Sequence, residues 1–296
     1  MKTEPIFRGV ATALITPLNA DGVDYDALGR LIDWQIDEGI NALVIAGTTG
    51  EGSTLTDEEH REVLRYSVER AAGRVPIIAG TGSNDTAYAI SLTKYACEIG
   101  ADAMLCVTPY YNKATQNGLI AMYTAIADAS TKPIILYNVP SRTGVSIEPA
   151  TYKALSSHPR IAAIKEANGA IAKIVETAAL VGDDLAIYSG NDDQVVPIMS
   201  VGGLGVISVL SNIMPRKTVE MCDRWFNGDV KGAAALQLEL LPLINALFSE
   251  VNPIPVKAAM AAMGWCENVV RLPLTTMEDA HWQKLAALMR EQGLID

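Results

Sequence analysis

The chain has 296 residues, 49% hydrophobic and 19% charged, so it can form one large domain or two of average size. Acidic residues exceed basic ones by 11, which argues against nucleic acid as a partner because phosphate binding needs a basic surface. The four cysteines form no CxxC pair and the three histidines are far apart, so a metal site built on them is not expected. A magnesium ion bound by carboxylates alone stays open.

The first eight residues carry charge and lack the apolar core of a signal peptide. No stretch reaches transmembrane length without a charge, a glycine or a proline. These two features predict a cytoplasmic protein without membrane contact.

Short apolar segments recur about every 25 to 35 residues, the length of a strand-plus-helix unit. Continuous apolar strands, as opposed to alternating ones, are typical of a parallel sheet that is covered on both faces. The predicted strands cover residues 10–15, 42–45, 76–79, 103–107, 133–137, 161–165, 185–189 and 205–208.

The segments between these strands carry helix signals. Residues 56–59 form a capping-box pattern, and Asp24 and Asp85 are predicted to cap the helices that they precede. Gly39 and Gly100 then end two of the helices, because glycine readily adopts the left-handed conformation found there.

Eight consecutive units predict a (β/α)₈ (TIM) barrel over residues 1–227, with its eighth helix at 214–226. A doubly wound open sheet is the alternative, but the chain lacks the glycine fingerprint that binds phosphate in such folds. Residues 228–296 form a C-terminal helical region, with helices predicted at 230–247, 255–263 and 275–292.

Lys165 ends the apolar strand at 161–165. A buried lysine loses the hydration of its charged form, and the neutral amine that burial favours is a nucleophile for carbonyl carbons. This position therefore suggests imine chemistry. The alternative is a lysine whose stem packs along the strand while its amine reaches water.

Barrel active sites lie at the carboxyl ends of the strands, where other polar groups also occur. Residues 47–51 read Gly-Thr-Thr-Gly-Glu, a turn suited to a carboxylate or phosphate, or simply a generic connection. Arg142 can clamp a carboxylate or form a surface ion pair. Tyr137 and the pair Tyr110-Tyr111 can supply hydroxyls, cap the core or form an interface. Together with Lys165 they favour a class I aldolase-type site.

With these residues the chain resembles the dihydrodipicolinate synthase family, within the N-acetylneuraminate lyase superfamily of pyruvate-dependent aldolases. The resemblance covers essentially the whole length. The motifs that carry it are at residues 47–51, 76–82, 107–112, 137–144, 164–166 and 252–257.

The resemblance implies condensation of pyruvate with L-aspartate-4-semialdehyde to 4-hydroxy-tetrahydrodipicolinate, in lysine and diaminopimelate biosynthesis, without a metal or other cofactor. Lys165 would form the imine with pyruvate. Tyr137, Thr48 and Tyr111 match the family's proton relay, in which the last of these reaches in from a neighbouring subunit of a homotetramer, a dimer of dimers.

The resemblance also implies the substrate-binding residues. Thr48 and Thr49 would lie near the pyruvate carboxylate, and Arg142 would hold the carboxylate of the semialdehyde. Gly190 and Ile207 match backbone positions around the reacting centre. Two alternatives remain: another pyruvate aldolase, such as N-acetylneuraminate lyase or a 2-keto-3-deoxy-sugar-acid aldolase, and a non-catalytic barrel that serves binding or assembly.

Some members of the family are inhibited by lysine at a dimer-interface site, which His60, Asn84 and Tyr110 match. Two positions differ, because Asp57 stands where histidine is common and Tyr88 where a glutamate binds the lysine ammonium group. The missing carboxylate predicts weak or absent inhibition by lysine.

Overall fold

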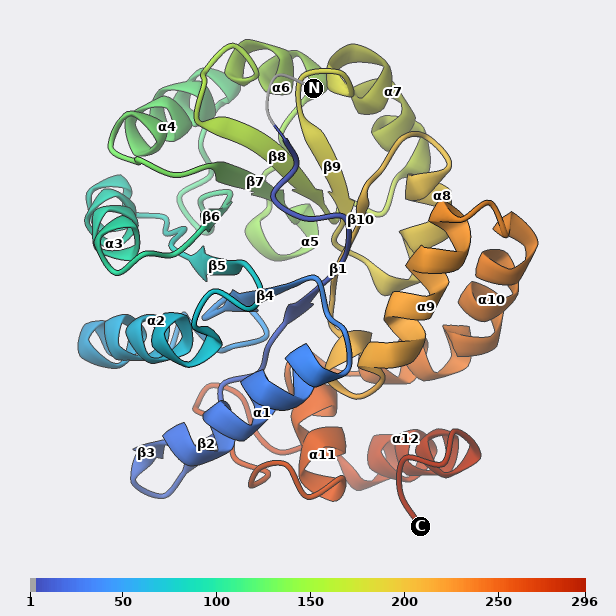
Figure 1. Ribbon diagram of the computed structural model, residues 1–296. Coiled ribbons are helices and arrows are strands. Elements are labelled where there is room, and N and C mark those ends of the chain that lie inside the picture. Colours follow the sequence, from blue (N-terminus) through green and yellow to red (C-terminus); the bar gives the residue numbers. More distant parts are fainter. Residues whose placement is uncertain (1–3) are drawn as a thin grey trace.

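The computed structural model describes residues 4–296 and contains a closed barrel of parallel strands. The barrel strands are β1 (Gly9–Ala13), β4 (Ala42–Ile45), β5 (Ile77–Gly80), β6 (Ala103–Val107), β7 (Ile134–Asn138), β8 (Ile161–Glu166), β9 (Ala186–Ser189) and β10 (Gly205–Ser208). Their order around the barrel is β1-β10-β9-β8-β7-β6-β5-β4 (Figure 1). The predicted fold class is confirmed, and the strand ends differ from the predicted ones by at most two residues.

Helices surround the barrel on its outer side (Figure 1). They are α1 (Tyr25–Asp37), α2 (Asp57–Ala71), α3 (Thr86–Glu98), α4 (Gln116–Asp128), α6 (Pro149–Leu155), α7 (Ile171–Val181), α8 (Val195–Met199) and α9 (Pro215–Phe226). The predicted caps are confirmed: the side chains of Asp24 and Asp85 accept from the first turns of α1 and α3. Thr56 and Glu59 form the capping box of α2.

Several short elements were not predicted. The hairpin β2 (Leu18–Asn19) and β3 (Gly22–Val23), the helix α5 (Pro140–Thr143), and the 3₁₀ turns η1 (Asp192–Gln194) and η2 (Leu210–Asn212) are too short to show a periodicity. α5 matters most for the site because it carries Arg142. It ends at Gly144, whose φ of 69° places it in the left-handed region.

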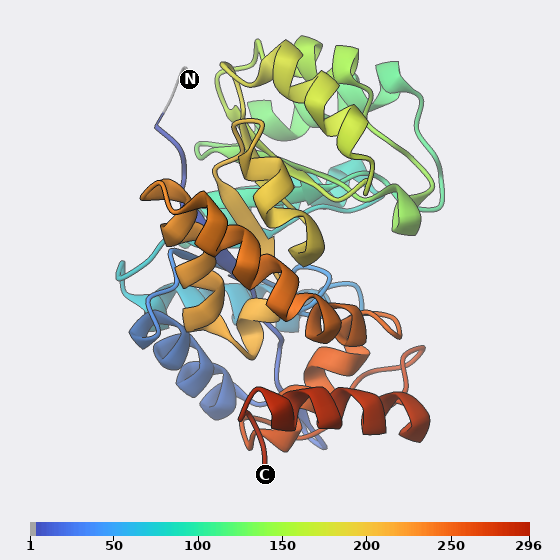
Figure 2. The same cartoon turned by 90° about the vertical axis from the view of Figure 1, so that its right-hand side faces the viewer.

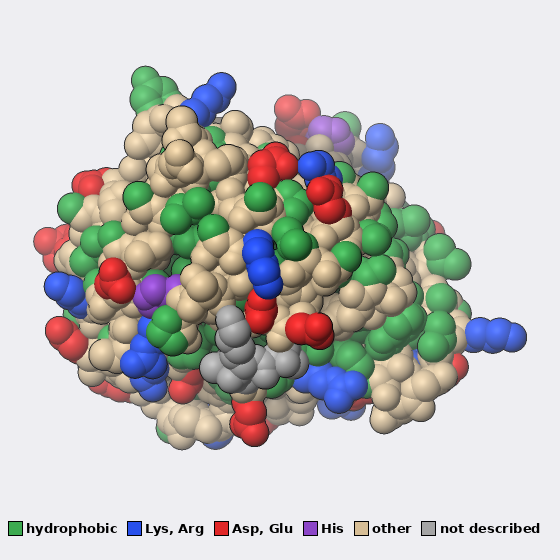
Figure 3. Space-filling model, turned by 90° about the horizontal axis from the view of Figure 1, so that it is seen from above, with side chains coloured by type: hydrophobic (Ala, Val, Ile, Leu, Met, Phe, Trp, Pro, Cys, Tyr) green, Lys and Arg blue, Asp and Glu red, His purple; other side chains and the backbone are tan. Residues whose placement is uncertain are grey.

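The C-terminal region consists of α10 (Val230–Leu247), α11 (Ile254–Ala262) and α12 (Asp279–Glu291), and α12 begins four residues later than predicted. Figures 1 and 2 show these orange-to-red helices against one side of the barrel. α10 has the length and mean hydropathy of a membrane span, but core helices share this property, and α10 packs against α9 and α12. On the face shown in Figure 3, the described acidic and basic side chains are interspersed, without a continuous basic surface.

The core has two layers, one inside the barrel and one between the strands and the helices. Successive side chains of a strand point to opposite faces, so each strand contributes to both layers. Ala163 and Tyr137 belong to the inner layer, and Lys165, two residues after Ala163, shares their side. Glu166 faces outward and contacts Tyr152 of α6.

Candidate active site

A cavity of about 610 Å³ lies at the carboxyl ends of the barrel strands. Its wall is formed by the loops that follow β4, β5, β6 and β7, which is where a barrel of this kind places its functional groups. Thr48, Tyr137 and Arg142 line it together, so the structure brings three of the predicted site residues to one cavity.

Lys165 is buried, with 6% of its surface exposed, so its amine does not extend into water. The Nζ atom lies 4.2 Å from the centroid of the Tyr137 ring, close enough for a cation–π contact. Tyr137 and Lys165 are paired in the register of β7 and β8, which fixes this proximity in the backbone. Within residues 4–296, the amine forms neither a hydrogen bond nor an ion pair.

A second lysine, Lys257 of α11, is fully buried but is paired. Its amine forms an ion pair with Glu51 and donates to the carbonyl of Val269 at 2.8 Å. Burial lowers the pKa of Lys257, and Glu51 opposes that shift. Sequence reasoning missed this lysine, although it stands in an apolar segment just as Lys165 does. Its partners identify it as an anchor that holds the loop after β4 to α11.

Thr49 and Arg142 are joined by a residue to which sequence reasoning gave no role. Asn252 donates from its side-chain amide to the Thr49 hydroxyl at 3.0 Å. Arg142 donates to the backbone carbonyl of Asn252, also at 3.0 Å. Thr49 itself is 2% exposed and does not line the cavity. The C-terminal region therefore contributes directly to the site, which its helical sequence pattern did not indicate.

The structure does not bring Tyr111 to the cavity of its own chain. Its side chain is 92% exposed, and its backbone has a φ of 72°. Its neighbour Tyr110 does line the cavity. The turn between β6 and α4 thus directs the two adjacent tyrosines differently.

Gly190 directly follows β9, the neighbour of β8, and Ile207 lies on β10, one strand further around the barrel; neither lines the cavity. Gly190 donates its N–H to the Glu166 carbonyl at 2.7 Å. A Cβ atom on Gly190 would stand 2.7 Å from that of Ala167, so only glycine fits this close approach. Ile207 is fully buried inside the barrel.

Asp192 ties these two strand ends together. One of its carboxylate oxygens accepts from the backbone N–H groups of Val209 and Leu210, both at 2.9 Å. Burial raises the pKa of Asp192, and its hydrogen bonds, followed by the positive charge of Lys165, oppose that shift. Its other oxygen is buried and has no hydrogen-bond partner among the described residues.

Lys165 itself does not line this cavity, which is bordered beyond Thr48, Tyr137 and Arg142 by a second group of residues: Asp57, His60, Tyr88 and Tyr110. Asp57 is already paired, since Arg61 donates to it at 2.8 Å. Burial and the neighbouring Asp57 raise the pKa of Tyr88 to about 12, so its phenol stays neutral. This part of the cavity wall therefore presents a paired carboxylate and a neutral phenol.

One group of residues could hold a metal by proximity alone. The ligand atoms of Glu250, Glu278 and His281 lie within 4.8 Å of one another. Glu250 accepts from the backbone N–H of Glu278 at 2.9 Å, and its carboxylate lies 2.8 Å from Nδ1 of His281. These hydrogen bonds account for the cluster, which does not line the cavity.

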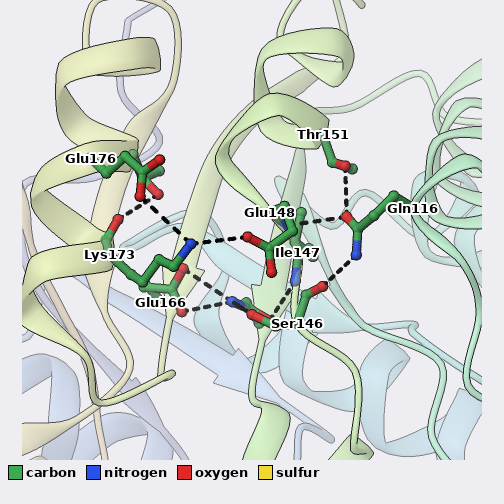
Figure 4. Close-up of polar contacts among 10 residues, drawn as sticks. Gln116, Ser146, Ile147, Glu148, Thr151, Glu166, Lys173 and Glu176 are labelled. Carbon is green, nitrogen blue, oxygen red and sulfur yellow. Dashed lines mark hydrogen bonds and ion pairs between the residues drawn. The ribbon is translucent and has the colours of Figure 1, made fainter.

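Glu166, next to Lys165 in sequence, is 1% exposed and lies on the other face of β8. Burial raises its pKa to about 7, and hydrogen bonds from Asn138, Tyr152 and the backbone of Asn168 oppose that shift. The network to which it belongs is shown in Figure 4.

A raised folded-state pKa means that folded Glu166 holds its proton more tightly than the unfolded chain does. Its contribution to the free energy of unfolding is complete below its ordinary pKa and is lost as the pH rises through about 7. The loss amounts to at most about 3 kcal/mol, and Glu166→Gln should remove it. Urea unfolding of both proteins at several pH values checks this.

The exposed Glu148, paired with Lys173, supplies the control, because Glu148→Gln should leave the wild-type pH dependence in place. Parallel stability–pH curves for wild type and Glu166→Gln would contradict the assignment.

The fold and the site together define a class: a (β/α)₈-barrel enzyme with a buried lysine at a strand end and a cavity at the carboxyl ends of its strands. The model of the dihydrodipicolinate synthetase family matches residues 6–292. The chain belongs to that family, as its motifs predicted.

Known relatives cover nearly the whole chain. A 4-hydroxy-tetrahydrodipicolinate synthase from Lachnoclostridium phytofermentans is 55% identical over 98% of this chain and 99% of its own. The solved dihydrodipicolinate synthase from Acinetobacter baumannii, complexed with pyruvate, has a TM-score of 0.95 and 43% identity, covering 97% and 99%. The enzyme from Cyanidioschyzon merolae, with lysine bound, has a TM-score of 0.95 and 38% identity, covering 99% and 100%. These relatives favour the synthase over other pyruvate aldolases and over a non-catalytic barrel.

Proposed function

We propose that the chain condenses pyruvate with L-aspartate-4-semialdehyde to 4-hydroxy-tetrahydrodipicolinate, the lysine and diaminopimelate precursor, in the cytoplasm. Family membership supports the reaction, and one observation supports the mechanism. The Lys165 amine is buried and unpaired beside Tyr137, at the strand ends where Thr48 and Arg142 also meet. This is the environment that an imine-forming lysine requires.

The chemistry begins when the neutral Lys165 amine adds to the ketone carbon of pyruvate, and loss of water then gives the imine. Loss of a methyl proton converts the imine into an enamine, whose carbon adds to the aldehyde of the second substrate. The amino group of that substrate then attacks the imine carbon and displaces Lys165, which closes the ring. Overall, one pyruvate and one semialdehyde give one product molecule and one water.

Two groups are assigned to the substrate carboxylates. Thr48 and Thr49 lie in the turn after β4, where hydroxyl and N–H groups suit the carboxylate of pyruvate. Arg142 lines the cavity and is assigned to the carboxylate of the semialdehyde. Asn252 bonds to Thr49 and to Arg142, so the two carboxylate sites keep a fixed separation.

Pyruvate and borohydride should trap a reduced adduct on Lys165, because hydride converts the imine into a stable secondary amine. Intact and peptide mass spectrometry would show one added pyruvate unit on that residue. Lys257 is an internal control, since its amine is paired with Glu51 and should stay unmodified. A wild-type protein without adduct, or with the adduct elsewhere, would contradict the proposal.

Tyr137, Thr48 and Tyr111 are assigned to proton transfer, with Tyr111 acting in the cavity of a neighbouring subunit of a homotetramer. The 92% exposure of the Tyr111 side chain supports this arrangement, because it is free to enter a partner. Tyr137 and Thr48 already share the cavity of one chain.

Co-expression of Tyr111→Phe with Lys165→Ala tests this arrangement. If Tyr111 acts across the interface, a mixed dimer contains one complete site, and random pairing restores about a quarter of the wild-type sites. Each variant alone should be nearly inactive, with a loss of about 10²-fold or more for Tyr111→Phe. No recovery in tagged, purified mixed dimers would show that Tyr111 does not act across the interface.

Lysine should inhibit this enzyme weakly or not at all. A bound ammonium group needs a charge partner when it leaves water, and this part of the cavity wall offers the Tyr88 phenol and an Asp57 that is already paired with Arg61. Steady-state rates with added L-lysine check this, and Tyr88→Glu should increase the sensitivity to lysine. Inhibition of the wild type by submillimolar lysine would contradict the prediction.

A further inference from the structure

We propose that Glu166 is a positioning residue for the imine-forming step: together with Asn138 it forms a clamp on the outer face of β7 and β8 that fixes Lys165 and Tyr137 on the inner face. This inference rests on the proposed function, because it concerns the rate at which Lys165 reacts with pyruvate.

The register of the two strands provides the geometry. Tyr137 is paired with Lys165, and one residue further on Asn138 is paired with Glu166. The Asn138 amide nitrogen lies 3.0 and 3.2 Å from the two carboxylate oxygens of Glu166. The clamp therefore joins the last residues of both strands directly behind the two inward side chains.

The Glu166 carboxylate has donors on both oxygens. Besides the Asn138 amide, the backbone N–H of Asn168 donates to Oε1 and the Tyr152 hydroxyl donates to Oε2, both at 3.0 Å. Above a pH of about 7, where Glu166 is ionised, its carboxylate accepts all of these hydrogen bonds, whereas a glutamine would turn an NH₂ group towards donors. The neighbouring layer between strands and helices is apolar, so a carboxylate there carries a desolvation cost that a purely space-filling side chain avoids.

The side-chain amide of Asn138 also contacts the loop that follows α5, the helix that carries Arg142. Asn138 accepts from the backbone N–H of Ile147 at 3.1 Å. Gln116 of α4 extends the network, donating to the carbonyl of Ser146 at 2.8 Å and accepting from the backbone N–H of Glu148 at 3.1 Å. Figure 4 shows this network, with Glu166 on one side, Gln116 on the other, and Ser146 and Ile147 between them.

These contacts connect the backbone segments that carry Lys165, Tyr137 and Arg142. The hydrogen bond between Asn138 and Glu166 joins the ends of β7 and β8. The hydrogen bond from Ile147 to Asn138 attaches the loop that follows α5 to the same point. A displacement of about 1 Å at a reacting group can cost about 10²-fold in rate. Disturbing the clamp should therefore slow imine formation more than it weakens the binding of pyruvate.

Glu166→Gln is the direct test. In single-turnover experiments with pyruvate and borohydride, we expect the rate constant of imine formation to fall about tenfold or more, with a smaller change in the KM for pyruvate. The matched control is Glu148→Gln, an exposed carboxylate at the outer end of the same network, which should react at the wild-type rate.

The double variant Asn138→Asp/Glu166→Gln reverses donor and acceptor. The new carboxylate on β7 would still accept from the N–H of Ile147 and would now accept from the new amide on β8. Imine formation should therefore recover most of its rate, which a loss of stability alone does not explain. If Glu166→Gln does not fold, Tyr152→Phe serves instead, because it removes one donor and keeps the carboxylate, and a severalfold loss of rate is expected.

The inference would be overturned if folded Glu166→Gln, or Tyr152→Phe in its place, formed the imine at the wild-type rate. It would also be overturned if the double variant reacted no faster than Glu166→Gln. The wild type separates this failure from that of the proposed function. A wild type that forms no adduct contradicts the function, whereas a reactive wild type matched by its variant contradicts the clamp alone.

Discussion

The alternation of side chains along β7 and β8 is the constraint on which the rest of the site depends. Because successive residues face opposite sides, Tyr137 and Lys165 enter the barrel while Asn138 and Glu166 face the helices. The reacting amine can therefore stay buried and unpaired while its strand is held from the other face. A shift of one residue in either strand would exchange the two pairs and destroy both arrangements.

The chain has two buried lysines near the site, and their hydrogen-bond and ion-pair partners distinguish the structural one from the reactive one. Lys257 has Glu51 and a backbone carbonyl, and its ion pair fixes the turn that carries Thr48 and Thr49. The Lys165 amine lies against the Tyr137 ring and, within the described residues, forms neither a hydrogen bond nor an ion pair. Pairing stabilises the first lysine as a cation, whereas the second keeps its lone pair accessible to a carbonyl carbon when it loses its proton.

Sequence reasoning predicted the barrel because eight apolar strands and strong caps, such as Thr56 with Glu59, leave local signals. It also predicted that Thr48, Tyr137 and Arg142 meet, because strand ends of a barrel share one face. It missed Asn252, Lys257 and the clamp at Glu166, whose partners lie far apart in the sequence and are chosen by tertiary packing. The helix α5 was missed because one turn has no periodicity.

The central claim is that pyruvate reacts inside the barrel with Lys165 while the outer-face residues hold the strand ends. A crystal structure of the protein after reduction with borohydride in the presence of pyruvate tests it most directly. The account predicts a secondary amine at the Nζ atom of Lys165, with its carboxylate at the turn of Thr48 and Thr49 and the Asn138–Glu166 clamp unchanged. Electron density for the adduct on another lysine, or an adduct pointing away from that turn, would contradict it.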